Sequence, residues 1–215
     1  GIGPTWQLGH SSTNSNSGCG DPSFPFRKLA KKKVLVKMVE QLIGEGVTII
    51  FSQIFLKPPE KGRPKPIHQD NHYFGPDDTN AMVTAWIALD DANLQNGCLY
   101  FLPGSHKSSL FERVPALSET QIDALFQHYP EWRNIEPVAA EVNAGDAVFI
   151  SGMIAHAAGP NMSRGMRRAF AILFMPEGAT FTGRQSALPD TVFAKLKIGS
   201  VITDEEHLPL LYSRR

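Results

Sequence analysis

Short runs of β-branched and aromatic residues, ended by Gly, Pro or Asn, fill most of the chain between residues 47 and 176. Such runs predict β-strands, because these side chains fit a pleated, half-buried surface. The predicted strands are 47–56, 81–89, 98–102, 138–142, 147–151 and 168–175. Strands in this number, with turn residues between them, indicate a β-sandwich or jelly roll.

Two stretches have the spacing of helices instead. Apolar residues recur at helical intervals at Leu35, Met38, Val39, Leu42 and Ile43. Gly44 follows them, at the position where a helix is expected to end. A capping-box pattern, Ser-Glu-Thr-Gln at 118–121, predicts a short helix that runs to about residue 127. We therefore expect a mainly β fold with flanking α-helices.

The length of 215 residues fits one domain. The segment 9–20 is polar, small and turn-rich, so we expect residues 1–24 to form a flexible lead-in. The strand-rich part, 47–176, is expected to form the β-core that carries the site, and 177–215 a C-terminal extension.

Composition and charge weaken several classes of function. The chain has 21 Lys and Arg residues against 21 Asp and Glu, so it lacks the broad positive field that general nucleic-acid binding needs. No run approaches the ~18 consecutive apolar residues of a membrane span. Cys19 and Cys98 are too few for a disulfide scaffold, and the first residues lack a signal-peptide pattern. We expect a cytoplasmic protein that binds neither nucleic acid nor membrane.

His68 and Asp70 stand two residues apart after the first predicted strand. On an extended segment, side chains two residues apart point the same way, so this imidazole and this carboxylate can converge. His156, after the predicted strand 147–151, is the best candidate for a third ligand. Two histidines and one carboxylate on one face of an octahedral Fe(II) leave the other positions open. The spacing alone is a weak signal, and a surface H-x-D pair without a metal remains the default interpretation.

Arg167 strengthens the metal hypothesis. A ferrous ion with one carboxylate ligand keeps one positive charge and Arg167 adds another, so a dianion such as 2-oxoglutarate would balance the pair. One end of this keto-diacid can chelate the metal while the guanidinium binds the far carboxylate. Arg168 points to the opposite face of a strand, so either arginine could be the one that faces inward, and a surface arginine is the alternative.

Several motifs follow one another in a specific order. They are HQDNHYF (68–74), VTAW (83–86), NGCLYFLPGSHKSSL (96–110), Gly-Asp (145–146) and HAAGPNMSRGMR (156–167). In this order they resemble the phytanoyl-CoA dioxygenase (PhyH) family, over more than half of the chain. The members are non-haem Fe(II)/2-oxoglutarate oxygenases. The resemblance therefore implies a double-stranded β-helix, a jelly roll similar to that of the cupins.

The resemblance also implies roles for individual residues. It implies iron ligands at His68, Asp70 and His156, and a salt bridge from Arg167 to 2-oxoglutarate. Trp86 is expected to line the co-substrate pocket.

Further residues are expected near the same site. Gln53 and Thr84 are weaker candidates for contact with 2-oxoglutarate. Ala158 departs from the family, which often has a hydroxyl residue there, so one hydrogen bond to the co-substrate carboxylate is expected to be missing. Candidates for contact with the substrate or for support of the site are His72, Tyr73, Lys57 and Asn161.

The activity that the resemblance implies is hydroxylation of an unactivated C–H bond of a small molecule, with Fe(II), 2-oxoglutarate and O2, and with release of succinate and CO2. No catalytic residue is expected beyond the metal centre. The Asp70 carboxylate favours hydroxylation, because the related halogenases lack it. Two alternatives stay open: a catalytically silent jelly roll that binds a metabolite, and a cupin-like enzyme in which the same three residues hold Zn(II) or Mn(II).

Overall fold

The computed structural model describes residues 25–44, 46–73, 82–108, 126–183, 188, 190–204, 208 and 210–212, apart from the side chains of 27, 72, 73 and 212. The predicted lead-in, 1–24, lies outside the described residues. So does the predicted helix 118–127, apart from its last two residues.

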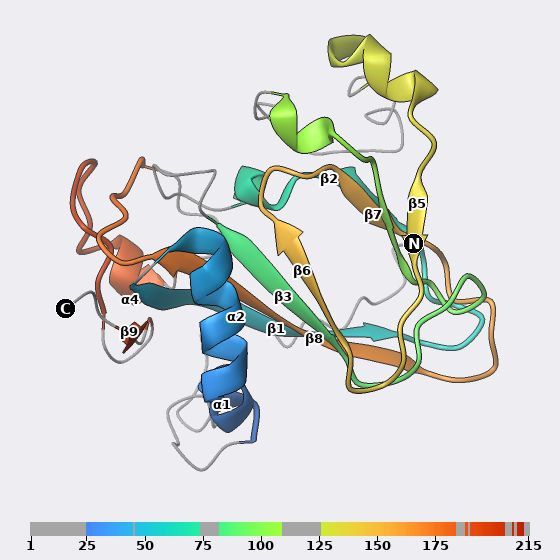
Figure 1. Cartoon of the computed structure of the whole chain (residues 1–215), viewed down its shortest axis with the longest axis horizontal. Helices are drawn as coiled ribbons and strands as arrows, with labels where there is room; N and C mark the ends of the chain where they lie inside the picture. Colours follow the sequence, from blue (N-terminus) through green and yellow to red (C-terminus); the bar gives the residue numbers. More distant parts are fainter. Residues whose placement is uncertain are drawn as a thin grey trace.

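The larger sheet has five strands in the order β6-β3-β8-β1-β9. They are β6 (Ala147–Ser151), β3 (Val83–Ala88), β8 (Arg167–Pro176), β1 (Val47–Lys57) and β9 (Leu210–Tyr212). Every neighbouring pair is antiparallel. Figure 1 shows the two long strands β1 and β8 side by side through the middle of the molecule.

The smaller sheet has four short strands in the order β2-β7-β4-β5, all antiparallel. They are β2 (Lys65–His68), β7 (His156–Ala158), β4 (Leu99–Phe101) and β5 (Val138–Ala140). One buried cluster joins the sheets: Trp86 and Ala171 of the larger sheet lie in it together with Leu99 and Ala158 of the smaller one. The two sheets therefore pack face to face, which is the predicted jelly roll.

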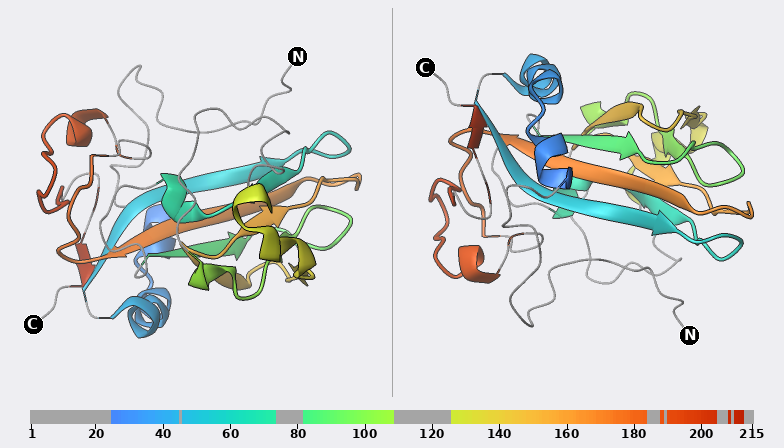
Figure 2. Two further views of the ribbon diagram at one scale, coloured as in Figure 1. Left: turned by 90° about the horizontal axis from the view of Figure 1, so that it is seen from above. Right: turned by 90° about the horizontal axis from the view of Figure 1, so that it is seen from below.

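Helices α1 (Pro25–Ala30) and α2 (Lys33–Ile43) cover the other face of the larger sheet, as the two views of Figure 2 show. Val39 of α2 is fully buried against this sheet. Gly44 has a positive φ of 88° and donates its backbone N–H to the Glu40 carbonyl, so α2 ends where the sequence predicted. None of the described helices has the length and apolar character that crossing a membrane requires.

Other helical segments in the described part of the chain are short. They include η1 (Asp70–Tyr73), η3 (Ser105–Lys107), η4 (Pro130–Asn134) and α4 (Asp190–Phe193).

The predicted mainly β fold is confirmed, and β1, β3, β4, β5, β6 and β8 lie within the six predicted strands or extend them by one residue. The structure adds β2, β7 and β9, which the apolar runs did not predict. β2 and β7 matter for function because His68 ends the first and His156 begins the second. The division into lead-in, β-core and extension stays a prediction.

Candidate metal centre

His68, Asp70 and His156 come together in the structure, with their ligand atoms all within 4.8 Å of one another. Asp70 Oδ1 lies 3.5 Å from His68 Nε2 and 3.6 Å from His156 Nε2. The two histidines are direct partners across the antiparallel pair of β2 and β7. Pairing of these two strands therefore brings together two imidazoles that are far apart in the sequence.

Asp70 reaches the site in a way that differs from our expectation. We expected His68 and Asp70 on one extended segment, but β2 ends at His68 and Asp70 begins the single turn η1. Gln69 Nε2 donates to the Met153 carbonyl at 2.8 Å, and the Asn71 backbone N–H donates to the Gly152 carbonyl at 3.0 Å. These bonds on either side of Asp70 hold η1 against the turn before His156, so the ligands converge through a turn and not through alternation along a strand.

On both imidazoles it is Nδ1 that faces a backbone carbonyl. His68 Nδ1 lies 2.8 Å from the Pro66 carbonyl, and His156 Nδ1 lies 3.0 Å from the Ile154 carbonyl. Because a carbonyl only accepts, each Nδ1 carries a proton, and in the neutral ring Nε2 then has the lone pair that can bind a metal. This is the tautomer in which histidine binds a metal through Nε2.

Burial and neighbouring groups shift the pKa of both Asp70 and His156. Burial acts to raise the pKa of Asp70, but the neighbouring histidines and a hydrogen bond from Thr84 outweigh it and hold this pKa well below its usual range. Burial, together with the nearby His68, lowers the pKa of His156 to about 4. At neutral pH the carboxylate is therefore charged and His156 is neutral, which are the forms that bind a divalent cation.

Of the two adjacent arginines, Arg167 is the one that faces inward. Its side chain is 2% exposed, and its Nε and Nη1 are buried with no hydrogen-bond partner among the described residues. Arg168 is on the other face, exposed, and makes a bidentate ion pair with Asp90. Burial lowers the pKa of Arg167 to about 10, so this guanidinium stays charged at neutral pH.

Trp86 and Gln53 lie in one row across the larger sheet, on either side of β8. Both are cross-strand partners of Ala171, Gln53 from β1 and Trp86 from β3. The Arg167 guanidinium carbon lies 5.2 Å from the centroid of the Trp86 ring, a cation–π contact. The buried donors of Arg167 beside Trp86 form a place for an anion, and the binding of the co-substrate there stays a prediction.

Thr84 makes a contact that the sequence did not suggest. Its Oγ1 donates a hydrogen bond to Asp70 Oδ2 at 2.6 Å. Ala158 is buried on the face of β7 that also carries His156.

Lys57 and Asn161 form a buried polar link between loops. Lys57 Nζ donates to the carbonyls of Arg63, at 2.8 Å, and Gly159. Asn161, 1% exposed, donates from Nδ2 to the Lys57 carbonyl at 2.9 Å and to the Gly165 carbonyl at 2.8 Å. Lys57 is thus buried with its ammonium on backbone carbonyls. Contact of Lys57 and Asn161 with a substrate stays a prediction.

His72 and Tyr73 belong to η1. The strand β2 does not continue past His68, so neither residue lies on a strand. Their side chains lie outside the described part of the structure, so contact with substrate stays a prediction for both.

Other supporting residues could not be identified from the sequence. Ser105, in the PGSH motif, accepts from the Ala155 N–H at 2.9 Å and donates to the Leu102 carbonyl at 2.7 Å, so it holds the residue before His156. Gln69 occupies the middle of the H-x-D motif. The only indication in the sequence is that Ser105 and Gln69 lie within the family-like motifs. Their hydrogen bonds join loops that come together only in the folded protein.

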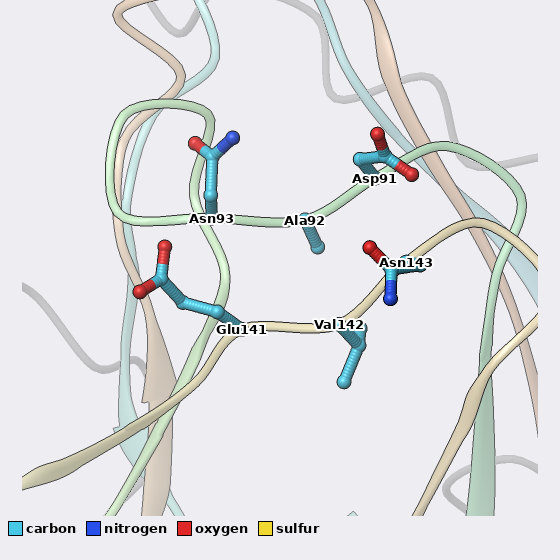
Figure 3. Close-up of a pocket in the computed structure, with 6 residues that line it drawn as sticks. All are labelled: Asp91, Ala92, Asn93, Glu141, Val142 and Asn143. Carbon is cyan, nitrogen blue, oxygen red and sulfur yellow. The ribbon is translucent and has the colours of Figure 1, made fainter.

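A hollow of about 260 Å³ lies at the end of the smaller sheet that is opposite to His156. Figure 3 shows its polar lining. The residues around it are Asp91, Ala92, Asn93, Glu141, Val142 and Asn143. Two of its carboxylates already bind backbone N–H groups, Asp91 that of Ala144 and Glu141 that of Leu94. These carboxylates therefore stabilise turns, and the hollow is separate from the triad.

Comparison with known proteins agrees with this geometry. The chain matches the sequence model described as phytanoyl-CoA dioxygenase (PhyH) over residues 12–169. It is 33% identical over 146 residues to the human peroxisomal phytanoyl-CoA dioxygenase, an alignment that covers 65% of this chain and 43% of that protein. The chain thus spans less than half the length of this curated relative.

Two solved structures share the fold. The carbocyclase SnoK from nogalamycin biosynthesis, described as non-heme and alpha ketoglutarate dependent, has a TM-score of 0.72 at 26% identity, over 86% of this chain and 70% of that one. The epimerase SnoN, in complex with Fe3+, alpha ketoglutarate and nogalamycin RO, has a TM-score of 0.69 at 25% identity, over 86% and 73%. Because the family model matches residues 12–169, which is most of its length, the chain belongs to the phytanoyl-CoA dioxygenase family.

Proposed function

We propose that this protein is an Fe(II)- and 2-oxoglutarate-dependent dioxygenase that hydroxylates a small molecule. The observation that carries the proposal is the convergence of His68, Asp70 and His156, whose ligand atoms all lie within 4.8 Å of one another while each Nδ1 faces a backbone carbonyl. Two imidazoles and one carboxylate with open positions are typical of non-haem Fe(II) oxygenases.

The buried residues fit the implied groups. His68, Asp70 and His156 would hold Fe(II), and Arg167, whose buried nitrogens lack a protein partner among the described residues, would bind the far carboxylate of 2-oxoglutarate. When bound, the iron and 2-oxoglutarate activate O2, with succinate and CO2 as products and one oxygen atom transferred to the substrate C–H bond.

The chain's own residues bind and orient these groups. Asp70 supplies one negative charge to a divalent ion, and the Arg167 guanidinium adds one positive charge nearby, so the site attracts a dianion. Trp86 stacks on the guanidinium and limits its rotation, while Gln53 lies on the other side of Ala171. These contacts favour a single pose for a keto-diacid between the two sheets.

The substrate and the outcome are proposed only as classes. SnoK is described as a carbocyclase and SnoN as an epimerase, so this fold serves more than one oxidative outcome in proteins that resemble the chain. We propose hydroxylation because Asp70 occupies the third ligand position.

The proposal is tested by succinate formation under aerobic conditions, with Fe(II), 2-oxoglutarate and a panel of small molecules. We expect succinate only when both are added, and a product heavier by one oxygen atom for an accepted substrate. Asp70→Ala removes the carboxylate ligand and should abolish succinate formation. Asp91→Ala, in the hollow that is separate from the triad, is the matched control and should keep it.

Two results would contradict the proposal. Succinate formation at the wild-type rate by Asp70→Ala would exclude the triad as the iron site. A protein purified without oxygen that holds zinc or manganese, and forms no succinate after iron is added, would favour a different metal chemistry.

We also propose that the protein works in a reducing compartment, the cytoplasm being the simplest. Cys98 is a free thiol and completely buried, which supports a reducing environment. The mammalian relatives are named as peroxisomal. Fractionation of cells that express the full-length protein would distinguish the cytoplasm from the peroxisome.

A further inference from the structure

The two oxygens of Asp70 have different partners. Oδ1 lies 3.5 and 3.6 Å from the Nε2 atoms of His68 and His156, whereas Oδ2 accepts a hydrogen bond from Thr84 Oγ1 at 2.6 Å. A carboxylate only accepts hydrogen bonds, so the Thr84 hydroxyl must be the donor. One oxygen therefore faces the other two ligands, and the other is held by the protein.

Thr84 is a rigid donor. It lies in β3, paired with Ile150 of β6 on one side and Leu173 of β8 on the other, and is 7% exposed. Its β-branched side chain has few accessible rotamers in such a strand. The hydroxyl is therefore fixed by the larger sheet.

Asp70 by itself is far less constrained. It begins the single turn η1 at the end of the smaller sheet, and the terminal torsion of an aspartate is broad and close to two-fold. Without a donor on Oδ2 the carboxylate could turn and present either oxygen, or both, to a bound ion. The hydrogen bond thus crosses between the sheets and selects one orientation.

We propose that Thr84 is a positioning residue that restricts Asp70 to metal binding through Oδ1 alone. This inference rests on the proposed function, since it concerns the same metal site. A carboxylate that binds through one oxygen occupies one coordination position and leaves the others for co-substrate and O2. Thr84 cannot at the same time donate to 2-oxoglutarate, because its only hydroxyl proton is already donated to Asp70 Oδ2. Its role therefore differs from the co-substrate contact expected from the sequence.

The test compares Thr84→Val with Thr84→Ser. Valine keeps the shape and loses the donor, whereas serine keeps the donor. The readout is Mn(II) affinity, measured by electron paramagnetic resonance on metal-free protein without 2-oxoglutarate. We expect Thr84→Val to bind Mn(II) about 10- to 100-fold more weakly, which is typical for loss of such a supporting bond, and Thr84→Ser to stay within about threefold of the wild type.

Thr48→Val is the matched control. Thr48 is as buried as Thr84 and lies two strands away, in β1 of the same sheet, where it pairs with Met175 of β8. Its replacement should leave Mn(II) affinity unchanged. If Thr84→Val fails to fold, as judged by circular dichroism, Thr84→Ala provides the same comparison with a smaller side chain.

The outcomes separate this inference from the proposed function. If the wild-type protein binds no Mn(II), or Asp70→Ala binds it equally well, the proposed metal site is wrong. If the wild type binds Mn(II) and Thr84→Val binds it with the same affinity, only the role of Thr84 is wrong. Unchanged Mn(II) affinity with weakened 2-oxoglutarate binding would also overturn it, in favour of a direct co-substrate contact.

Discussion

Arg167 and Arg168 have opposite surroundings although they are adjacent in β8. Arg168 is exposed and paired with Asp90, as surface arginines commonly are. Arg167 is buried with two nitrogens that have no hydrogen-bond partner among the described residues. Burial of an unpaired guanidinium costs free energy, which a bound carboxylate would offset. The two residues therefore provide a matched pair for testing the co-substrate site.

Arg167→Met should weaken 2-oxoglutarate binding on the order of 10- to 100-fold, as expected for loss of charge-assisted hydrogen bonds. Isothermal titration of the Mn(II)-loaded protein measures this dissociation constant. Arg168→Met removes the same charge from the outer face and should change it little. Equal effects of the two substitutions would mean that net charge, and not a specific pocket, attracts the dianion.

The ligands were predictable at the residue scale, but their supports were not. His68, Asp70, His156 and Arg167 stand in short motifs with chemically distinctive side chains. Thr84 could be named as close to the site, yet its bond to Asp70 depends on the distance between two sheets. No pattern within one segment carries that information.

At the scale of elements, long strands were easier to predict than short ones. β1 and β8 have 11 and 10 residues, and apolar runs mark both. β2 has four residues, two of them exposed, and includes Pro66. β7 has only three residues. Such strands form because neighbours fix them and not because of their own propensity. Since His68 and His156 lie on these strands, the site depends on the elements that are hardest to predict.

Gly152 shows how closely the segments around the site approach each other. A Cβ at this position would lie 1.8 Å from Asn71 Oδ1, next to Asp70. Gly152→Ala should therefore displace η1, lower the free energy of unfolding by about 1–3 kcal/mol, and weaken Mn(II) binding. Urea unfolding and the Mn(II) titration measure the two effects.

Gly165→Ala is the control for this prediction, because a Cβ there has no atom of another segment within 4 Å. It should change neither quantity appreciably. Wild-type Mn(II) affinity in Gly152→Ala would mean that the contact between Asn71 and Gly152 does not position Asp70.

At the scale of the whole molecule, the site requires that two sheets keep a fixed separation. The metal-ligand candidates belong to the smaller sheet and its adjoining turn, whereas Thr84, Trp86 and Arg167 belong to the larger sheet. Lys57 ends β1 of the larger sheet and donates to the Gly159 carbonyl just after β7. A buried lysine thus links the sheets at the end where Arg167 begins β8, opposite it in register.

This link predicts how stability depends on pH. Burial, together with the nearby Arg167 charge, lowers the pKa of Lys57 from its ordinary 10.5 to about 8. Between pH 8 and 10.5 the unfolded chain holds a proton that the native Lys57 has released, so this group makes the protein more stable as pH rises. Lys57→Met has no titrating group there. The free energy of unfolding of the wild type minus that of the variant should therefore increase across this range in urea titrations. Lys61→Met, in the exposed loop that follows, controls for loss of a lysine at the surface. A difference that stays constant or falls with pH would show that the Lys57 ammonium is not held in the buried position between the sheets.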